Sequence, residues 1–459
     1  MLLRHYESKR VAVLGLGAAN RAAAHALQVS GAEVWGWDDD AGARAKAQKN
    51  NINLVDLYQA NLSECSALLV SPGIPHRGAR AHALARRAQA DGCPIIGELV
   101  LLDHIEGTYK SVAITGTNGK TTTVSLLGHI LTHAGIKHRL LGNIGTPIFA
   151  EETFQDDTVY VFELSSFQLD FAHKQGFAVA VLLNMASDHV SHHGDEGAYY
   201  RAKEQIFVGG SREDDAFVSV DDALCCRVAE ALSSGGRHVI KMSTQRAVAG
   251  GIGIEDGKLV DLTGESSFVS QDVVGLGVPL MSVVAAYGVA RTLGVSSETI
   301  MASLSSFVVL AHRLEVVASC GGVTYINDSK ATNVHACQYA LARYDALFWI
   351  AGGSSKGEDL TPLGESMARV RHAFLMGESA LSLKEALGGR VDVTVCADMA
   401  GAVALAHRQA RAFVEEKAGR TATVLLSPAC ASFDQFGDYK ERGRVFTQAV
   451  KAVLAQDGV

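Results

Sequence analysis

Short apolar segments alternate with helix-like segments along nearly the whole chain. Each apolar segment ends in Gly, Asp or Ser-Pro, as in RVAVLGLG (10–17), AEVWGWDDD (32–40), ALLVSPGIP (67–75) and LFWIAGG (347–353). Strands and helices that alternate in this way predict an α/β fold with parallel sheets. In open sheets of this kind, ligands bind in the loops that follow the carboxyl ends of the strands.

The chain has 459 residues, which corresponds to roughly three domains of ordinary size. We expect a Rossmann-like domain over residues 1–108, a central domain over 109–310 and a third α/β domain over 311–459. Within the central domain, residues 249–270 alternate polar and apolar side chains around Asp-Gly and Thr-Gly turns. That pattern predicts a small antiparallel ribbon.

Composition and charge exclude several classes of protein. Hydrophobic residues make up 48% of the chain and charged residues 20%, a normal balance for a globular protein. No apolar run approaches the ~20 residues of a membrane helix, and no signal-peptide pattern precedes the first strand. The net charge of −8 includes no basic run, and the eight cysteines show no zinc-binding spacing. We therefore expect a cytoplasmic protein with reduced thiols and with neither a membrane nor a nucleic-acid partner.

Residues 113–131, AITGTNGKTTTVSLLGHIL, have the layout of a phosphate-binding loop. A strand, a Gly-containing turn and a helix follow one another, so that backbone N–H groups and the helix dipole face an anion. Lys120 is expected to reach the β and γ phosphates of a nucleotide, and the Thr121 hydroxyl to bind Mg²⁺. The motif is shortened, because Ile114 stands where the standard spacing has a glycine. An ordinary Gly-rich turn is the alternative, and the strand–loop–helix context argues against it. The loop residues expected to hold phosphates are Gly116, Thr117, Asn118, Gly119, Lys120 and Thr121.

Two further strand ends in the central domain carry groups that suit a magnesium ion. Glu163 ends one apolar strand, and Asp188 and His189 follow the next. Mg²⁺ is usually held by few protein oxygens together with substrate phosphates, which suits Glu163, and His189 can bind a second ion. Taken singly, Glu163 fits a helix N-cap and His189 a polar loop residue. Their presence in the domain of the phosphate loop favours a functional role.

Two other polar features of the central domain are ambiguous. His192 and His193 lie in a Gly-rich loop without the i, i+4 spacing of a helical metal pair, so we expect them in a solvated loop. Lys203 lies on the amphipathic segment YYRAKEQIF (199–207), close enough in sequence to His189 to face the same site. The helical pattern by itself is more typical of a surface lysine.

The first domain carries an incomplete dinucleotide fingerprint. Gly15 and Gly17 follow a strand, and Asp38 ends the next strand about 20 residues later. Asn20 replaces the third glycine and adds a side chain where the helix should pack closely against the strand. The motif supports a Rossmann-like fold that accepts some nucleotide, and it is weak evidence for NAD.

Three loops of the third domain offer lysine, hydroxyl and amide groups after apolar strands. They are YINDSKATN (325–333), IAGGSSKGEDL (350–360) and LLSPACASFDQFGDYKERG (425–443). Such groups at neighbouring strand ends predict a pocket for an anionic small molecule. Cys430 has no histidine nearby in sequence, so we interpret it as a small packing residue.

Together these motifs resemble the Mur ligases of bacterial cell-wall synthesis. The resemblance covers the whole chain, and its most specific stretches are GTNGKTTT (116–123), ELSSFQLD (163–170), HRLEVV (312–317), INDSKATN (326–333) and LLSPACASFDQF (425–436). It implies a Rossmann-like N-terminal domain that binds a UDP-substrate, a central phosphate-loop ATPase domain and a Rossmann-like C-terminal domain that binds an amino acid. The implied reaction, carried out by a monomer, joins D-glutamate to UDP-N-acetylmuramoyl-L-alanine through an acyl phosphate, with ATP and a pair of Mg²⁺ ions.

The resemblance also implies roles for individual residues. Lys203 matches a lysine that is carbamylated in the family, which turns it into an anion able to orient a second Mg²⁺. The residues matched to catalysis or to Mg²⁺ are Lys120, Thr121, Glu163, His189 and Lys203. Those matched to nucleotide contacts in the third domain are Arg313, Asp328 and Lys330. Those matched to the UDP-substrate are Asp38, Asp39, Ser71 and Asn143, and those matched to D-glutamate are Thr332, Lys356, Ser432 and Tyr439.

One stretch departs from the family pattern. Where the family has Gly-x-His-Asn-x-x-Asn, the chain reads GVPLMSVVAA (277–286), so the asparagines on the adenine side are missing.

Other functions are compatible with parts of the sequence. A related ATP-dependent amide ligase, either another Mur ligase or a folylpolyglutamate synthase type, would share the phosphate machinery and differ in the third domain. A non-catalytic nucleotide-binding regulator would not need Lys120, Glu163 and Lys203. An NAD oxidoreductase would leave the same three residues without a role, and Asn20 weakens that interpretation further.

Overall fold

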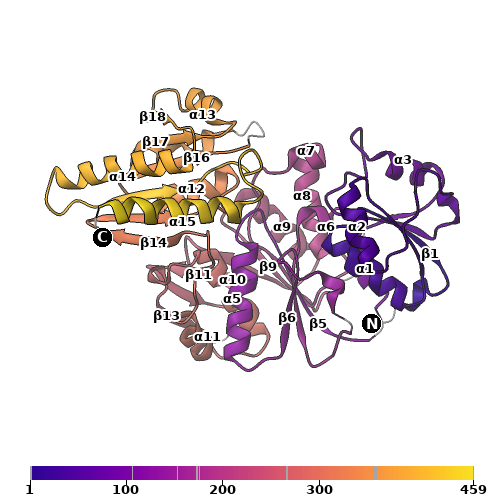
Figure 1. Ribbon diagram of the computed structural model, residues 1–459. Helices are drawn as coiled ribbons and strands as arrows, with labels where there is room; N and C mark the ends of the chain where they lie inside the picture. The colour runs from indigo at the N-terminus through magenta and orange to yellow at the C-terminus, as the bar shows by residue number, and fades with distance from the viewer. Residues whose placement is uncertain are drawn as a thin grey trace. The chain divides into compact units, whose positions relative to one another are not determined.

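The computed structural model describes residues 3–105, 107–151, 153–171, 174, 176–264, 267–354 and 359–457. The chain divides into two compact units, Met1–Phe307 and Val308–Val459. Each unit is built from α-helices and largely parallel β-sheets (Figure 1), so the predicted α/β class is confirmed.

A four-stranded parallel sheet opens the first unit. Side by side lie β2 (Glu33–Trp37), β1 (Arg10–Leu14), β3 (Ala67–Val70) and β4 (Ile95–Ile96). The helices of this part are α1 (Ala18–Val29), α2 (Ala41–Lys49), α3 (Ala83–Ala90) and α4 (Glu98–Leu102). Because β2 and β3 lie on opposite sides of β1, the chain leaves the end of β1 at a point where the strand order reverses. Such a point is where Rossmann-like sheets bind ligands.

A nine-stranded sheet in the same unit carries the phosphate loop. Its strands in spatial order are β13 (Phe268–Asp272), β12 (Lys258–Asp261), β11 (Ile252–Glu255), β10 (Val239–Ser243), β9 (Asp215–Ser219), β8 (Val179–Leu182), β5 (Lys110–Thr115), β7 (Val159–Glu163) and β6 (His138–Gly142). The strands from β6 to β11 are parallel, whereas β11, β12 and β13 are antiparallel and confirm the predicted ribbon. The helices are α5 (Lys120–His133), α6 (Ser166–Leu169), α7 (Val190–His193), α8 (Glu196–Glu204), α9 (Ala223–Ser234), α10 (Leu280–Thr292) and α11 (Ser297–Leu304).

The second unit contains a six-stranded sheet. Its strands in spatial order are β14 (Glu315–Cys320), β15 (Val323–Asn327), β19 (Ala422–Leu426), β16 (Leu347–Gly352), β17 (Val370–Met376) and β18 (Asp392–Val395). Only the pair β14–β15 is antiparallel among these neighbours. The helices are α12 (Val334–Arg343), α13 (Ala380–Leu387), α14 (Met399–Glu415), α15 (Tyr439–Gln456) and the 3₁₀ helix η6 (Thr361–Arg369).

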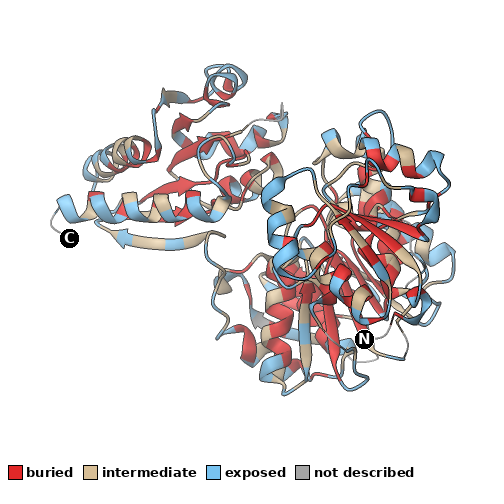
Figure 2. Cartoon of the chain, turned by 45° about the vertical axis from the view of Figure 1, so that its right-hand side comes forward, coloured by how far each residue is buried: buried red, intermediate tan, exposed pale blue. Residues whose placement is uncertain are grey.

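Buried apolar strands form the core of each unit. Figure 2 shows most of the central strands as buried, and helices with one buried and one exposed face. Many helices begin at a short polar side chain that accepts a hydrogen bond from the first turn. These N-caps include Asp40, Asp195, Asp222, Ser296, Asn333, Asp398 and Asp438. Across the described residues, no helix has the length and apolar character needed to span a bilayer.

The parallel strands bring three loops to one edge of the nine-stranded sheet. Strands β7 and β8 flank β5 on its two sides, with Ile114 paired to Glu163 and Thr115 paired to Leu182. The loop after β5 therefore lies between the loops that follow β7 and β8.

Candidate active site

The loop between β5 and α5 turns at two glycines. Gly119 adopts φ +88°, in the left-handed region that favours glycine. A Cβ atom at Gly116 would lie 2.9 Å from the Cβ of Leu183, so a side chain there would clash with the chain after β8. Because the N-cap of α5 is a glycine, no side chain caps the helix, and the N–H groups of its first turn can bind an anion.

Asn184, two residues after the end of β8, stabilises this loop. Its Oδ1 accepts a hydrogen bond from the backbone N–H of Asn118 (2.9 Å), and its Nδ2 donates to the carbonyl of Asn118 (3.1 Å). The backbone N–H of Thr117 donates to the carbonyl of Asn184 (3.1 Å). These three bonds hold the loop in place before any ligand binds.

Two lysines converge on the carbonyl oxygen of Gly116. Lys120 Nζ donates to it at 2.6 Å, and Lys203 Nζ, from helix α8, donates to it at 2.9 Å. Positive charges on both amines would repel each other, and that repulsion is relieved by an anion beside them or by loss of a proton from one amine. The arrangement therefore suits a phosphate group.

Lys203 is buried, with 1% of the residue accessible. Burial, followed by the charge of Lys120, holds the pKa of Lys203 well below its ordinary value, and Asp188 acts in the opposite direction. A lowered pKa favours the neutral amine, which is the nucleophilic form of lysine. The interpretation of Lys203 as a surface lysine is therefore wrong, because α8 presents this residue to the protein interior.

Tyr199 is a residue of this site that the sequence reasoning missed. Its hydroxyl lies 3.0 Å from Thr117 Oγ1, and its ring centroid lies 4.6 Å from Lys203 Nζ. Burial raises the pKa of Tyr199, so the hydroxyl remains protonated and neutral. The spacing of four residues between Tyr199 and Lys203 on one helix was the available signal, since such residues share a face.

Glu163 ends strand β7 as a buried carboxylate, with 1% of the residue accessible. Its Oε1 accepts a hydrogen bond from Asn143 Nδ2 at 2.9 Å. Its Oε2 is buried and has no hydrogen-bond partner among the described residues. Such an oxygen is costly to bury, and a divalent cation would satisfy it. Glu163 therefore fits a Mg²⁺ ligand whose other oxygen is oriented by Asn143.

The described part of the chain contains no preassembled group of three or more His, Cys, Asp or Glu side chains able to cage a metal. Mg²⁺ takes few protein ligands and completes its shell with water and phosphate oxygens, so the residues that suit it need not form such a cage. Thr121, in the first turn of α5, is half-buried.

His189 is the N-cap residue of the short helix α7 and adopts a left-handed conformation, with φ +53°. Its Nδ1 lies 3.5 Å from Asp188 Oδ1, and its ring packs on Phe167 with centroids 4.7 Å apart. The prediction of a solvated loop at His192 and His193 is wrong. Both are half-buried in α7 because their rings also pack on Phe167, at 4.4 and 5.5 Å.

Helix α10 supplies a contact that the sequence reasoning also missed. Thr123 lies in the first turn of α5, and its Oγ1 donates a hydrogen bond to Ser282 Oγ at 3.0 Å. Residues 283–290 of α10 are buried and mostly apolar. The part of the segment lacking the family's asparagines that lies within 283–286 is therefore packed in the protein interior.

In the first sheet, the loop after β1 meets the residues that follow β2 and β3. Gly15 adopts φ +83°, and a Cβ atom there would lie 2.6 Å from the Cβ of Ser71. The backbone N–H of Leu16 donates to Asp38 Oδ2 at 2.7 Å. Asn20, in place of the third glycine, is fully buried and donates to a carbonyl of β1 at 3.2 Å. The structure thus brings Asp38 and Ser71 together around Gly15.

Asp39 is held by three aromatic side chains. Its carboxylate accepts hydrogen bonds from Trp37 Nε1 (3.1 Å), the Tyr58 hydroxyl (3.3 Å) and His82 Nε2 (3.0 Å). Burial raises the pKa of Asp39, but the hydrogen bonds from His82 and Trp37 outweigh it, and the pKa is lowered overall. Asp39 is therefore a charged carboxylate with aromatic surfaces beside it.

In the second unit, Asp328 follows strand β15 as a buried carboxyl group. Its Oδ2 accepts from Ser427 Oγ (3.0 Å), and its Oδ1 accepts from the backbone N–H of Leu314 (3.2 Å). Burial raises the pKa of Asp328 to about 7, against the effect of these bonds and of Arg313.

Replacing Asp328 with asparagine is expected to change how stability depends on pH. The pKa of Asp328 in the folded state is about 7, whereas the pKa of an aspartate in an unfolded chain is about 3.9. As pH rises between these values, the unfolded wild-type chain releases a proton that the folded chain retains, so the free energy of unfolding falls. The Asp328→Asn variant loses this contribution. Its urea midpoint should therefore rise relative to that of wild type between about pH 4 and about pH 8. The exposed Asp345→Asn change is the control, and an equal trend in both variants would contradict the assignment.

Other matched residues of the second unit lie at the same end of its sheet. Lys330 Nζ lies 4.3 Å from the ring centroid of Tyr439, and the backbone N–H of Thr332 donates to the carbonyl of Lys330 at 2.8 Å. Ser432 is buried after β19. Lys356 lies outside the described residues.

Arg442, in the first turn of α15, links three loops of this unit, and the sequence reasoning missed it. Its Nε donates to Ser329 Oγ (3.0 Å), and its Nη1 donates to the carbonyls of Gly352 (3.4 Å), Cys430 (3.1 Å) and Ala431 (3.2 Å). Burial lowers the pKa of Arg442 to about 10. The rigid fork of donors in arginine suits this task. Cys430 is buried beside it, as expected of a packing residue.

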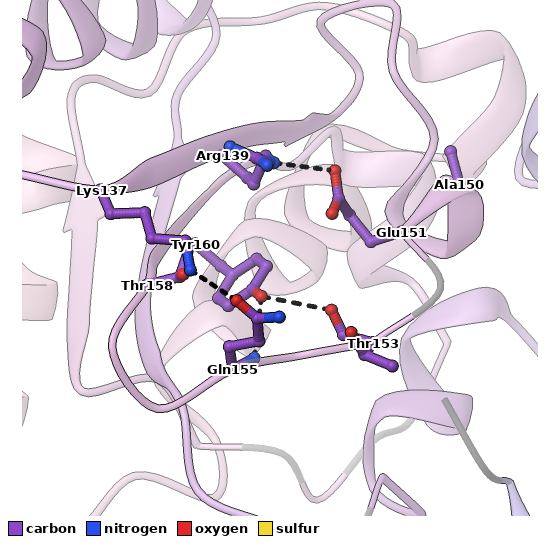
Figure 3. Close-up of a pocket in the computed structure, with 8 residues that line it drawn as sticks. All are labelled: Lys137, Arg139, Ala150, Glu151, Thr153, Gln155, Thr158 and Tyr160. Carbon is purple, nitrogen blue, oxygen red and sulfur yellow. Dashed lines mark hydrogen bonds and ion pairs between the residues drawn. The ribbon is translucent and has the colours of Figure 1, made fainter.

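A cavity of about 260 Å³ lies away from these loops, at the amino ends of β6 and β7 (Figure 3). Its two cations already form ion pairs, Lys137 Nζ with Asp157 Oδ1 at 3.0 Å and Arg139 Nε with Glu151 Oε1 at 3.3 Å. Because the phosphate loop follows the carboxyl end of β5, this cavity is separate from the candidate active site.

The parallel sheets, the Gly-Lys-Thr loop between β5 and α5, and the buried lysine and carboxylate at the same sheet edge define a phosphate-loop nucleotide-binding protein of the α/β class. Matches to models of known protein families identify the family within this class. The Mur ligase middle domain matches residues 114–274, and the "Mur ligase, glutamate ligase domain" matches residues 312–430.

Relatives match over nearly the full length. The UDP-N-acetylmuramoylalanine--D-glutamate ligase of Phenylobacterium zucineum is 39% identical, and the match covers 97% of each chain. The protein of the same name from Caulobacter vibrioides is 37% identical over 99% of this chain and 98% of its own. A pseudomurein peptide ligase type C from Methanothermus fervidus is similar in structure, with 15% identity, a TM-score of 0.56 and coverage of 97% of this chain and 100% of that one. The chain belongs to the Mur ligase family.

Proposed function

We propose that this protein is an ATP-dependent ligase that joins D-glutamate to UDP-N-acetylmuramoyl-L-alanine in peptidoglycan synthesis. The observation that carries the proposal is the convergence of Lys120 and Lys203 on the carbonyl of Gly116, within the phosphate loop. The names of the relatives that match over nearly the full length support the choice of substrates.

In the first step, the L-alanyl carboxylate attacks the γ-phosphorus of ATP. A new O–P bond forms, the bond from the γ-phosphorus to the leaving ADP oxygen breaks, and the product is an acyl phosphate. The N–H groups at the start of α5 bind the phosphates, and Lys120 balances the negative charge of the transferred group. Thr121, Glu163 and His189 would hold Mg²⁺, which supplies further charge neutralisation there.

In the second step, the amine of D-glutamate attacks the acyl carbon. A tetrahedral intermediate forms, the C–O bond to phosphate breaks, and the neutral amine loses one proton, so that the amide nitrogen keeps one N–H. We assign the D-glutamate pocket to Thr332, Lys356, Ser432 and Tyr439. We assign contacts with the UDP-substrate to Asp38, Asp39, Ser71 and Asn143, and nucleotide contacts of the second unit to Arg313, Asp328 and Lys330. The packing of Asp38 and Ser71 around Gly15 supports the assignment of the UDP-substrate contacts.

Lys203 acts as a carbamate in this proposal. Its neutral amine attacks the carbon of CO₂, an N–C bond forms and a proton is released. The lowered pKa of Lys203 supplies the neutral amine. The product places a negative charge beside Lys120, where the neutral amine carried none, and the two groups then attract each other. We further propose that the enzyme acts as a cytoplasmic monomer and uses a pair of Mg²⁺ ions, one of which the carbamate orients.

A release assay for ADP across a panel of amino acids tests the proposal. ADP release should require UDP-N-acetylmuramoyl-L-alanine together with D-glutamate, and L-glutamate, glycine, L-alanine and meso-diaminopimelate should give only background. Equal turnover with another acceptor would overturn the substrate assignment. Turnover of a folate with L-glutamate would favour the folylpolyglutamate synthase type instead.

A further inference from the structure

Glu98 is a buried carboxyl group that the proposed chemistry does not use. It is the first residue of α4, with 1% of the residue accessible. Its Oε1 accepts a hydrogen bond from Gln168 Nε2 at 2.6 Å, and its Oε2 has no partner among the described residues. Burial raises the pKa of Glu98, opposed by the bond from Gln168. Burying a carboxyl group with an unpaired oxygen costs free energy of folding. The hydrogen bond to Gln168 is the contact through which this group can act on its surroundings.

Gln168 is held in one orientation. Its Oε1 accepts hydrogen bonds from the backbone N–H (2.9 Å) and the hydroxyl (2.8 Å) of Ser165. Ser165 Oγ in turn accepts from the backbone N–H of Gln168 at 3.3 Å, which completes a capping box. Turning the amide over would place its NH₂ group against the N–H of Ser165. Gln168 Nε2 must therefore point to Glu98.

The turn that Gln168 holds comes directly after Glu163. Leu164 lies between Glu163 and Ser165, and its backbone is tied to strand β5. Its N–H donates to the carbonyl of Ile114 at 3.0 Å, and its carbonyl accepts from Thr115 Oγ1 at 2.8 Å. Thr115 is the last strand residue before the phosphate loop. Glu98, Gln168 and Ser165 thus connect α4 of the first sheet to the strand end that presents Glu163.

The surroundings leave this connection little freedom. A Cβ atom at Gly97 would lie 2.6 Å from the ring of Phe171, so α4 and the segment after α6 are in close contact. The ring of His76 stacks on Phe171 with centroids 4.0 Å apart, and His76 Nε2 lies 3.8 Å from Asp170 Oδ2. Because α4 and the segment after α6 are tightly packed, loss of the hydrogen bond between Glu98 and Gln168 should shift the turn at residues 164–168 rather than α4.

We propose that Glu98 is a positioning residue that, through Gln168, holds the turn after Glu163 and so sets the position of that carboxylate for a divalent cation. This inference rests on the proposed role of Glu163 as a Mg²⁺ ligand. Partners that orient a metal ligand typically change metal affinity or activity by about 10- to 100-fold when they are removed.

Mn²⁺ binding to the full-length protein in the presence of AMP-PNP, followed by electron paramagnetic resonance, tests the proposal without turnover. The Glu98→Leu variant removes the acceptor and should bind Mn²⁺ about 10- to 100-fold more weakly. The Glu98→Gln variant keeps an acceptor oxygen for Gln168 and should stay within about 2-fold of wild type. In ADP release, Glu98→Leu should need more Mg²⁺ for half-maximal activity, with an unchanged KM for D-glutamate.

Tyr287→Phe is the matched control, because it removes buried hydrogen bonds to Asp261 (3.0 Å) and Ser297 (2.8 Å) elsewhere in the same unit. It should lower stability without changing Mn²⁺ affinity. If Glu98→Leu does not fold, Ser165→Ala provides the test, because it removes the hydroxyl bonded to Gln168 and should weaken Mn²⁺ binding by a smaller factor.

Several results would overturn the inference. They are wild-type Mn²⁺ affinity in a folded Glu98→Leu variant, wild-type affinity in Ser165→Ala if only that variant folds, or Glu98→Gln as impaired as Glu98→Leu. A wild-type protein that binds Mn²⁺ with this dependence on Glu98, but releases no ADP with D-glutamate, would contradict the proposed function and leave the positioning role intact.

Discussion

Replacing Lys203 with alanine is expected to abolish ADP release that depends on D-glutamate, a loss of at least about 10²- to 10³-fold. The side chain contacts the carbonyl of Gly116 within the phosphate loop and lies beside Lys120. Its removal takes away the group that, as a carbamate, would balance Lys120 and orient a metal ion. The fold should tolerate the change, because an amine that is costly to bury is lost. The measurement is the rate of ADP release at saturating substrates, with the thermal midpoint measured in parallel.

Chemical rescue separates the carbamate from a purely structural role. High bicarbonate together with a short carboxylic acid should restore part of the activity of Lys203→Ala, since a small carboxylate can occupy the space of the carbamate. The exposed Lys49→Ala change at the end of α2 is the control and should leave the rate and its bicarbonate dependence unaltered. A fully active Lys203→Ala enzyme would refute the role of this lysine.

The Glu163→Gln variant is expected to lose about 10²- to 10³-fold in activity while its stability stays equal or rises. Gln keeps an oxygen that can accept the bond from Asn143. It removes the negative charge from a buried position whose second oxygen has no partner among the described residues, so the folded state no longer bears the cost of that charge. Metal binding, in contrast, depends on the charge. Activity should therefore fall while the urea midpoint stays equal or rises.

The matched control for this prediction is Glu151→Gln, the same change in a carboxylate at the opposite end of the sheet. Glu151 forms an ion pair with Arg139 beside the separate cavity shown in Figure 3. Its replacement should leave ADP release unchanged. A Glu163→Gln enzyme that is as active as wild type, or one that is inactive because it is unfolded, would contradict the assignment of Glu163 as a metal ligand.

Features encoded by consecutive residues were predictable from the sequence. The phosphate loop joins a strand to a helix within a few residues, so Lys120 and Thr121 could be placed without knowledge of the fold. The antiparallel ribbon over 249–270 was predictable for the same reason, because its turns and alternation are local. The roles of the UDP-substrate and D-glutamate residues came from the family resemblance, and they stay predictions.

Burial was the property that the sequence reasoning judged least well. The histidines of segment 190–193 precede a glycine and were expected to be solvated, but the ring of Phe167, in helix α6, packs on His192 and His193. Tyr199, Ser282 and Arg442 carry no local motif at all. Each has a hydrogen-bond partner in a chain segment remote in sequence, and only the spacing of Tyr199 from Lys203 on one helix gave a local signal.

The order of strands, turns and helices by itself determined the α/β class and the strand–loop–helix that we propose binds phosphate, because both follow from short-range periodicity and from glycine conformation. Only the tertiary structure decided that Lys203 meets the carbonyl of Gly116, 87 residues away in the chain. It also decided that Glu98 reaches Gln168 across 70 residues. Contacts of this length arise from the packing of whole sheets and helices, and the energy of that packing is spread over many side chains that no single stretch of sequence contains.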